Sequence, residues 1–90
     1  MLGELNDWFW AISFKHHGKH CRIRTIKDSG DTVAAVYYKD GICYGFIHYN
    51  DEKYGHPKTD HVQDKDLQVA MLKADIKLSE LGYKINKLGF

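Results

Sequence analysis

Three glycine-bearing turns divide the first half of the chain into four short segments, and their spacing limits what the chain can fold into. These turns are His17-Gly18, Asp28-Ser29-Gly30 and Asp40-Gly41, and Asp-Gly between alternating apolar residues is a strong signal for a two-residue hairpin. A slip of one residue would exchange the two faces of a strand, so the registers that the three turns set must agree. Together they predict a four-stranded antiparallel meander over residues 8–49.

The predicted register divides the strand residues between two faces of the sheet. A two-residue turn in the last hairpin pairs Ala35 with Phe46. The first hairpin, interpreted in the same way, pairs Ile12 with Ile23. Mostly apolar residues then share one face, which we expect to be the inner one: Trp10, Ile12, Phe14, Cys21, Ile23, Thr25, Val33, Ala35, Tyr37, Tyr44, Phe46 and His48.

The first segment also has the spacing of a helix. Its apolar residues recur every three or four positions, at Leu2, Leu5, Trp8, Phe9 and Ile12. The sequence therefore leaves residues 2–14 open between a strand and a helix.

The second half of the chain contains a polar stretch followed by a helical pattern. Residues 50–63 are polar and contain Gly55 and Pro57, which predicts a long loop. Residues 64–81 have the apolar stripe of an amphipathic helix, with Asp64 as its cap and Gly82 just after its end. We expect this helix to cover the inner face of the sheet, and the tail over residues 83–90 to add a short edge strand.

Length and composition exclude several classes of protein. Ninety residues leave room for one hydrophobic core, so we expect a single α+β domain over residues 1–90. Thirteen basic and twelve acidic residues give a net charge of +1, too small to draw the chain onto nucleic acid or anionic lipid. Two cysteines are too few for a disulfide framework, and no apolar stretch is long enough to span a bilayer. We therefore expect a cytoplasmic protein that enters no membrane.

The outward face of the predicted sheet is basic and aromatic. Arg22 and Arg24 stand there among small side chains, and the adjoining loop adds further basic and aromatic residues. Basic sheet faces with aromatic rings are typical of modules that bind single-stranded RNA or DNA, and an acidic protein partner would fit the same face. The arginines would otherwise only solubilise an uncovered face. The predicted contact residues are Lys15, His20, Arg22, Arg24, Tyr38, Tyr49, Lys53, Tyr54 and Lys58.

Six histidines raise the question of a metal site, because His and Cys are the usual ligands of zinc. Alternation along the strand sends Cys21 inward and His20 outward, and the other histidines lack the paired spacing of a zinc motif. A catalytic thiol is not indicated either, because His20 lies two strands from Cys43 in the predicted sheet. We expect no metal, no cofactor and no enzyme activity.

The predicted helix carries a second apolar stripe, formed by Val69, Leu72 and Ile76 on the side away from the sheet. Leaving three such side chains in water forgoes roughly 1.5–3 kcal/mol for each of them. We therefore expect the stripe to be covered, either by the ends of the chain, by a second copy in a homodimer, or by a host partner.

The predicted strands are followed by one helix that closes on Leu81-Gly82-Tyr83, all within ninety residues. In this architecture the chain resembles small phage-encoded accessory proteins, among them some anti-CRISPR inhibitors. The resemblance implies a non-enzymatic protein that binds or inhibits by covering a surface of a host protein or nucleoprotein complex. A module that binds single-stranded RNA or DNA is the alternative function.

Overall fold

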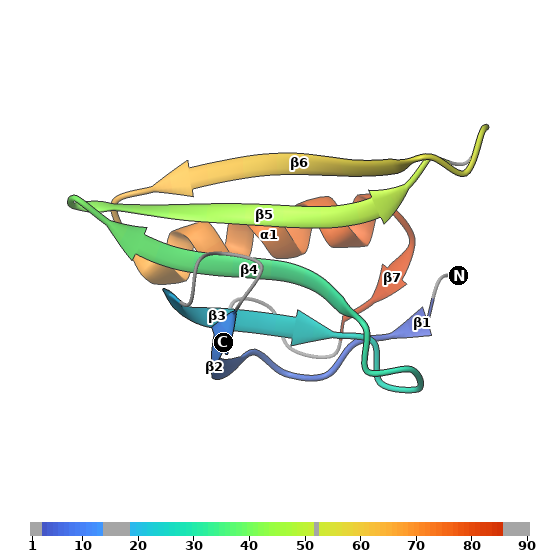
Figure 1. The fold of residues 1–90 in the computed structure, drawn as a ribbon, viewed down its shortest axis with the longest axis horizontal. Coiled ribbons are helices and arrows are strands. Elements are labelled where there is room, and N and C mark those ends of the chain that lie inside the picture. Colours follow the sequence, from blue (N-terminus) through green and yellow to red (C-terminus); the bar gives the residue numbers. More distant parts are fainter. Residues whose placement is uncertain (1–2, 14–18, 52, 86–90) are drawn as a thin grey trace.

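Five antiparallel strands follow one another across the main sheet, and the chain then returns as a helix across one face of it (Figure 1). The computed structural model describes residues 3–13, 19–51 and 53–85. The main sheet consists of β2 (Phe9–Ser13), β3 (Lys19–Thr25), β4 (Thr32–Lys39), β5 (Ile42–Asn50) and β6 (Pro57–Asp64). The remaining elements are α1 (Leu67–Glu80) and the two short strands β1 (Gly3–Glu4) and β7 (Tyr83–Lys84). The predicted α+β class, a meander packed on one C-terminal helix, is confirmed.

The β4–β5 hairpin has the predicted register. Ala35 pairs with Phe46, and Tyr37 pairs with Tyr44. Both turn residues have a positive φ, 53° at Asp40 and 85° at Gly41. Two successive positive φ angles define the turn type whose twist matches that of the flanking strands, which explains why Asp-Gly predicts this hairpin well.

The fifth strand corrects the predicted loop over residues 50–63. Residues Pro57–Asp64 pair with β5 from Asn50↔Pro57 to Cys43↔Asp64. The alternating residues Asp60 and Asp64 point towards α1, where Lys77 and Lys73 each form an ion pair of 3.1 Å with one of them. Because this strand lies at the sheet edge with one face in water, its sequence lacks the apolar alternation that identifies a buried strand.

The β2–β3 hairpin differs from the predicted register by three residues. Ile12 lies opposite His20 and Phe9 lies opposite Ile23, whereas we expected Ile12 opposite Ile23. The connection between the two strands falls at residues 14–18, outside the described part of the chain. An odd shift exchanges the faces of a strand, so Trp10 and Ile12 change sides relative to the predicted sheet. Residues Phe9–Ser13 form a strand, so the helical interpretation of this segment is wrong.

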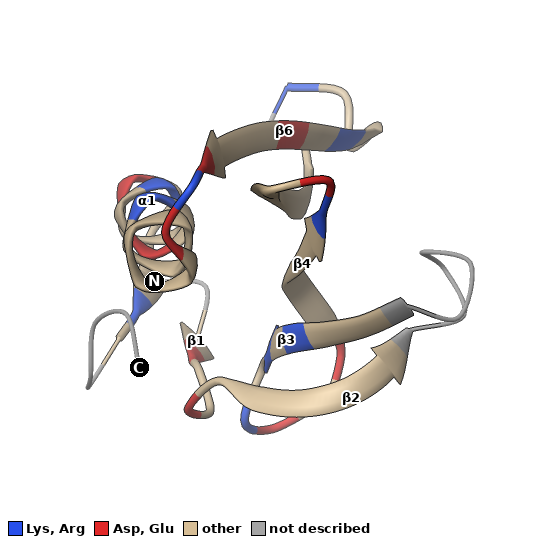
Figure 2. Cartoon of the chain, turned by 90° about the vertical axis from the view of Figure 1, so that its left-hand side faces the viewer, with Lys and Arg blue, Asp and Glu red and all other residues tan. Residues whose placement is uncertain are grey.

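The helix covers the face of the sheet that the sequence assigned to solvent. The strands curve around α1, which lies on their concave side (Figure 2). The main core consists of Leu5, Trp8, Val33, Ala34, Val36, Cys43, Ile47, Ala70, Met71, Ala74 and Leu78. Cys21, Ile23 and Ala35, expected in this core, form a smaller cluster on the opposite face. The predicted assignment of inner and outer faces is therefore wrong for most residues of β3, β4 and β5, whereas Val33 lies in the main core as expected and Trp10 and Ile12 lie on the helix side.

The helix begins and ends close to the predicted positions. Its N-terminal cap is Asp66, whose carboxylate accepts hydrogen bonds from the backbone N–H groups of Gln68 at 2.8 Å and Val69 at 3.2 Å. We had assigned this cap to Asp64, two residues earlier. Gly82 follows the last turn with a φ of 104°, the left-handed conformation expected there.

The predicted edge strand in the tail is shorter than expected and pairs elsewhere. Strand β7 forms a parallel pair with β1, in which Gly3 lies opposite Tyr83 and Glu4 lies opposite Lys84. It therefore extends a separate two-stranded sheet and not the meander. Residues 86–90 of the predicted tail lie outside the described residues.

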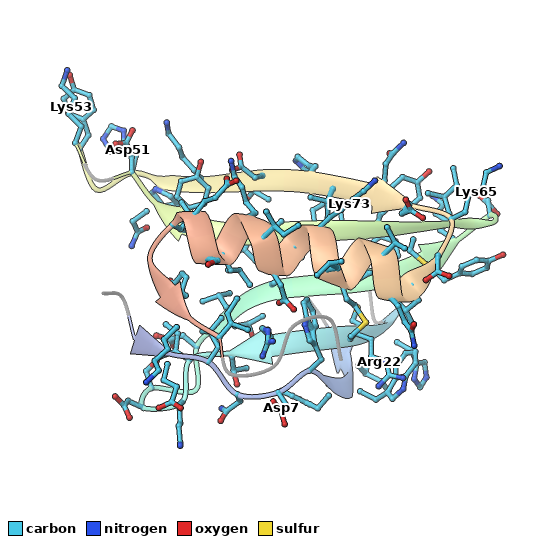
Figure 3. The ribbon with its side chains drawn as sticks, turned by 180° about the vertical axis from the view of Figure 1, so that it is seen from behind. Asp7, Arg22, Asp51, Lys53, Lys65 and Lys73 are labelled. Carbon is cyan, nitrogen blue, oxygen red and sulfur yellow. The ribbon has the colours of Figure 1, made fainter. Side chains whose placement is uncertain are left out.

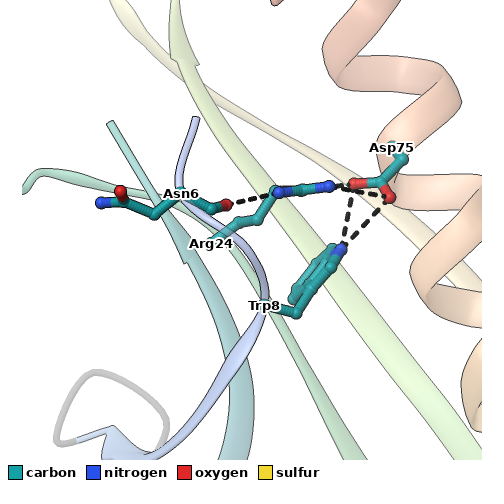
Figure 4. A network of polar contacts seen from close by, with 4 residues as sticks. All are labelled: Asn6, Trp8, Arg24 and Asp75. Atoms are coloured by element: carbon teal, nitrogen blue, oxygen red, sulfur yellow. Dashed lines mark hydrogen bonds and ion pairs between the residues drawn. The ribbon is translucent and has the colours of Figure 1, made fainter. Parts of the chain in front are cut away.

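A buried ion pair joins the sheet to the helix (Figure 4). Arg24 on β3 and Asp75 on α1 are both fully buried, and their side chains meet at 2.8 Å and 3.3 Å in a two-point contact. The indole N–H of Trp8 donates to both oxygens of the same carboxylate, at 3.1 Å and 3.2 Å. Arg24 also donates to the backbone carbonyl of Asn6. One carboxylate thus ties the N-terminal segment, β3 and α1 together.

We expect Asp75→Ala to lower the free energy of unfolding by about 3–5 kcal/mol, because it leaves the Arg24 guanidinium buried without its counterion. Denaturant unfolding measures this change. Glu80→Ala removes an exposed carboxylate from the same helix and serves as the control, expected within about 0.5 kcal/mol of the wild type.

The double variant Arg24→Met/Asp75→Leu replaces both charges by apolar groups of similar size. We expect it to be more stable than Asp75→Ala, because no unpaired charge is left in the core. Equal midpoints for Asp75→Ala and the wild type would show that the ion pair does not hold the two layers together.

Candidate binding site at the start of the helix

The predicted contact residues do not form one surface, because the face that carries them bends around the helix. Arg24 is fully buried in the ion pair with Asp75, so it cannot reach a partner, and its assignment to an outer surface is wrong. Tyr49 is half-buried against the main core. Lys15 lies outside the described residues. Figure 3 shows two of the others at opposite ends of the molecule, Lys53 at one end and Arg22 at the other.

The predicted contact residues at the tip of the β5–β6 hairpin are Lys53, Tyr54 and Lys58, and they mostly contact their own neighbours. Lys58 forms an ion pair of 3.1 Å with Asp51. The pKa of Asp51 lies below its usual value, first because it accepts a hydrogen bond from the backbone N–H of Lys53 and then because of Lys58. Lys53 lies 5.2 Å from the ring of Tyr54, which is itself 65% exposed. A hollow of about 250 Å³ lies beside this hairpin, and Tyr49 and Lys58 line it together with the polar residues Asn50 and Thr59.

The group at the other end surrounds a hollow. His20 and Tyr38, both predicted contact residues, line an apolar pocket of about 470 Å³ between the sheet and the start of α1. The pocket is lined by Trp10, His20, Val36, Tyr37, Tyr38, Cys43 and Leu67. A second hollow of about 240 Å³ shares Leu67 and is lined also by Trp8, Arg22, Gln68 and Met71. The first turn of the helix therefore separates two adjoining cavities.

Arg22 provides the positive charge of this site. Its guanidinium carbon lies 4.0 Å from the centre of the Trp10 ring, an arrangement in which the cation is attracted by the ring face. Its Nε atom is buried and has no hydrogen-bond partner among the described residues, and no described carboxylate forms an ion pair with it. This buried donor is an unfavourable feature of the protein by itself, and the guanidinium carries a positive charge that no described carboxylate neutralises.

Exposed rings form the rim of the pocket. Trp10 is 54% exposed and Tyr38 is 66% exposed. Ile12 follows on the same face of β2 and is also 54% exposed. We call Trp10, Ile12, His20, Arg22 and Tyr38 the Trp10 surface. The sequence pointed to three of its residues but placed Trp10 and Ile12 in the core, because the turn in the first hairpin is longer than two residues.

Cys43 is the thiol nearest to this site, and it is not activated. Burial raises its pKa, and the negative charges of Asp66 and Asp64 raise the pKa further. The reactive form of cysteine is the thiolate, so such a thiol is a poor nucleophile. Among the described residues there is also no cluster of three or more His, Cys, Asp or Glu side chains that could hold a metal ion. Among the described residues, the pocket therefore offers apolar surface and one cation, and its thiol is not activated.

A second aromatic surface, made mostly of half-buried rings, lies on the convex face of the sheet. Tyr37 stacks on Phe46 with ring centres 5.6 Å apart, and Phe46 meets the ring of His61 edge-on at 4.9 Å. Tyr44 lies beside Tyr37 at 6.0 Å. By alternation, no Asp or Glu among the described strand residues points to this side. The sequence assigned these rings to the core, so it identified them as a group and placed them on the wrong side.

The outer stripe of the helix is uncovered by the described residues. Val69, Leu72 and Ile76 are 39%, 38% and 50% exposed. Two of the terminal residues that we expected to cover them, Leu5 and Ile85, pack against the main core instead. The other candidates for this role, Leu2, Leu88 and Phe90, lie outside the described residues. The stripe is thus a second apolar surface, with no covering element assigned.

Comparison of the chain with protein-family models, with curated proteins and with solved structures found no match. Within the described residues, no helix has the length and apolar character needed to cross a membrane.

We expect Cys43 to react slowly with iodoacetamide at neutral pH, because its raised pKa and its burial keep it a protonated, shielded thiol. Peptide mapping by mass spectrometry after timed labelling measures the rate. The unfolded protein, in which both cysteines should react quickly, is the control. Labelling of Cys43 in the folded protein as fast as in the unfolded one would contradict this description of the site.

Proposed function

We propose that the protein is a non-enzymatic binding module that attaches to another protein through the Trp10 surface. The observation that carries this proposal is the composition of the surface around the pocket. Trp, Tyr and Arg are the residue types most enriched at the energetic centres of protein–protein interfaces, and here one of each lies beside an apolar hollow. With no activated nucleophile near them, they favour binding over catalysis.

The charges of the molecule favour a protein partner over nucleic acid. Binding to a phosphate backbone depends on several free Lys and Arg side chains. Here five basic residues already pair with carboxylates: Arg24, Lys27, Lys58, Lys73 and Lys77. Asp64 and Asp66 also lie close enough to Cys43 to raise its pKa, so the pocket has acidic neighbours. Such a surface suits a partner whose contact is mainly apolar.

The arrangement suggests how the partner is held. An apolar side chain of the partner would enter the pocket between Tyr38 and Leu67, and an oxygen atom beside it would accept a hydrogen bond from Arg22. Charged hydrogen bonds of this kind are among the stronger contacts when water is excluded from them. A protein of this size would act by covering part of its partner's surface. It could in this way inhibit a host protein or nucleoprotein complex.

The convex face favours a second candidate function, binding of single-stranded RNA or DNA. The stacked rings of Tyr37 and Phe46 form a platform without carboxylates, and bases stack on such platforms. Electrophoretic shifts with single-stranded RNA and DNA at low and at physiological salt test this function. A shift that persists at physiological salt and is lost in Phe46→Ala would establish it in place of the first proposal.

We expect Tyr38→Ala to weaken binding to the partner by about 30-fold, the effect of losing a contact worth about 2 kcal/mol. Tyr54→Ala is a matched control, because Tyr54 is 65% exposed against 66% for Tyr38 and lies at the other end of the sheet. Proteins retained from nuclease-treated extracts of the native host by wild type and variants are compared by quantitative mass spectrometry. Specific partners should be lost with Tyr38→Ala and kept with Tyr54→Ala. The reverse pattern would exclude the Trp10 surface.

A further inference from the structure

The two edges of the main sheet differ in how they are protected. Natural proteins guard exposed edges with proline, with charged side chains and with charges that point inward, because an open edge can pair with another chain. Strand β6 has all three features, with Pro57 at its start, Lys58 next to it, and Asp60 directed towards Lys77 of the helix. The edge formed by β6 is therefore protected against pairing.

Strand β2 at the opposite edge has none of these features. Its five residues carry no charge and no proline. Phe9 on one face is 43% exposed, and Trp10 and Ile12 on the other face are each 54% exposed. Among the described strands, β3 is the one that pairs with β2, so the outer backbone groups of β2 face no other described strand. An uncharged apolar strand at an open edge is typical of a site where another strand adds.

We infer that β2 pairs with β2 of a second copy of this chain, antiparallel and about a two-fold axis at Ala11. In this register Ala11 lies opposite Ala11 of the second copy. Trp10 then lies opposite Ile12 of the second copy, on the same face of the joined sheet. Each exposed apolar side chain on that face is thus placed beside another, which shields part of both from water. The two five-stranded sheets become one continuous ten-stranded sheet, if each keeps the strands that the structure describes.

The charges along the sequence favour a second copy as the occupant. The stretch from Trp8 to Phe14 is uncharged, with acidic Asp7 before it and basic Lys15 after it. An antiparallel alignment of two such sequences about Ala11 matches the acidic residue of each with the basic residue of the other. A parallel alignment would set like charges against each other. The strand is therefore complementary to itself in one orientation, the one that a closed two-fold dimer requires.

This dimer would also complete the Trp10 surface. Strands related by a two-fold axis perpendicular to the sheet show the same face on the same side, so both pockets open in one direction. Ile12 of the second copy continues the apolar rim beside Trp10. The inference goes beyond the proposed function, and its test measures the mass of the particle and not the binding of a partner. If the dimer is not found, the proposed binding of a partner protein can still be tested separately, and the converse also holds.

Ile12→Lys and Ile76→Lys form a matched pair of variants for sedimentation analysis. Ile12 is 54% exposed on β2 and Ile76 is 50% exposed on the outer helix stripe, the other candidate interface. We expect the wild type and Ile76→Lys to sediment as dimers and Ile12→Lys as a folded monomer, with circular dichroism confirming the fold. A monomeric wild type, a dimeric Ile12→Lys, or a loss of the dimer in Ile76→Lys would overturn the inference.

A cross-link tests the register directly and does not depend on how Ile12→Lys folds. Residues directly opposite in an antiparallel pair have Cα atoms about 4.5–5.5 Å apart, within the range of a disulfide. Ala11→Cys should therefore form a covalent dimer on mild oxidation. The background must be Cys21→Ala, because Cys21 lies opposite Ala11 within the same chain. Ile12→Cys in this background faces Trp10 of the second copy and should stay uncross-linked. Absence of a cross-link at position 11 would overturn the register.

Discussion

The buried contact between Arg24 and Asp75 determines which face of the sheet the helix covers. Both charges are fully buried and pair with each other, and Trp8 and Asn6 add hydrogen bonds to the pair. A helix packed on the opposite face would leave the carboxylate of Asp75 among the rings of that face, far from any guanidinium, at a cost of several kcal/mol. Apolar packing alone does not make this choice, since both faces carry apolar residues. The ion pair thus supplies orientation as much as stability.

Local features of the fold could be predicted from the sequence, and their assembly could not. The Asp40-Gly41 turn determines the β4–β5 register because its two positive φ angles are a property of those two residues. The predicted register of the first hairpin was wrong because β2 and β3 pair three residues away from the register that a two-residue turn at His17-Gly18 implies. Strand β6 was missed because its pairing with β5 depends on tertiary contacts with Lys73 and Lys77 rather than on apolar alternation. Arg24 was expected to be solvated, because nothing in the sequence next to it indicates that its partner is Asp75, 51 residues later.

Because the helix covers the face that was expected to meet solvent, the candidate site also differs from the predicted one. A basic face of two arginines was expected, and the structure separates them. Arg24 is part of the core, while Arg22 lies beside the first turn of the helix and contacts the ring of Trp10. The curvature of the sheet leaves that end of the concave face uncovered, which creates the pocket and exposes the apolar edge strand β2. The convex face, expected to be core, carries the rings of Tyr37 and Phe46 outside it. Sequence reasoning singled out these arginines and rings, but it assigned Arg24 to solvent and Tyr37 and Phe46 to the core.

The most direct test of this account measures which face of the sheet meets water. In solution NMR, a neutral paramagnetic agent broadens the signals of side chains that solvent reaches. The account predicts strong broadening of the Tyr44 and Phe46 ring signals and protection of the methyl signals of Val36, Ile47 and Leu78, which are fully buried. Protected Tyr44 and Phe46 rings together with broadened Val36 and Ile47 methyl groups would contradict it, because the helix would then lie on the other face.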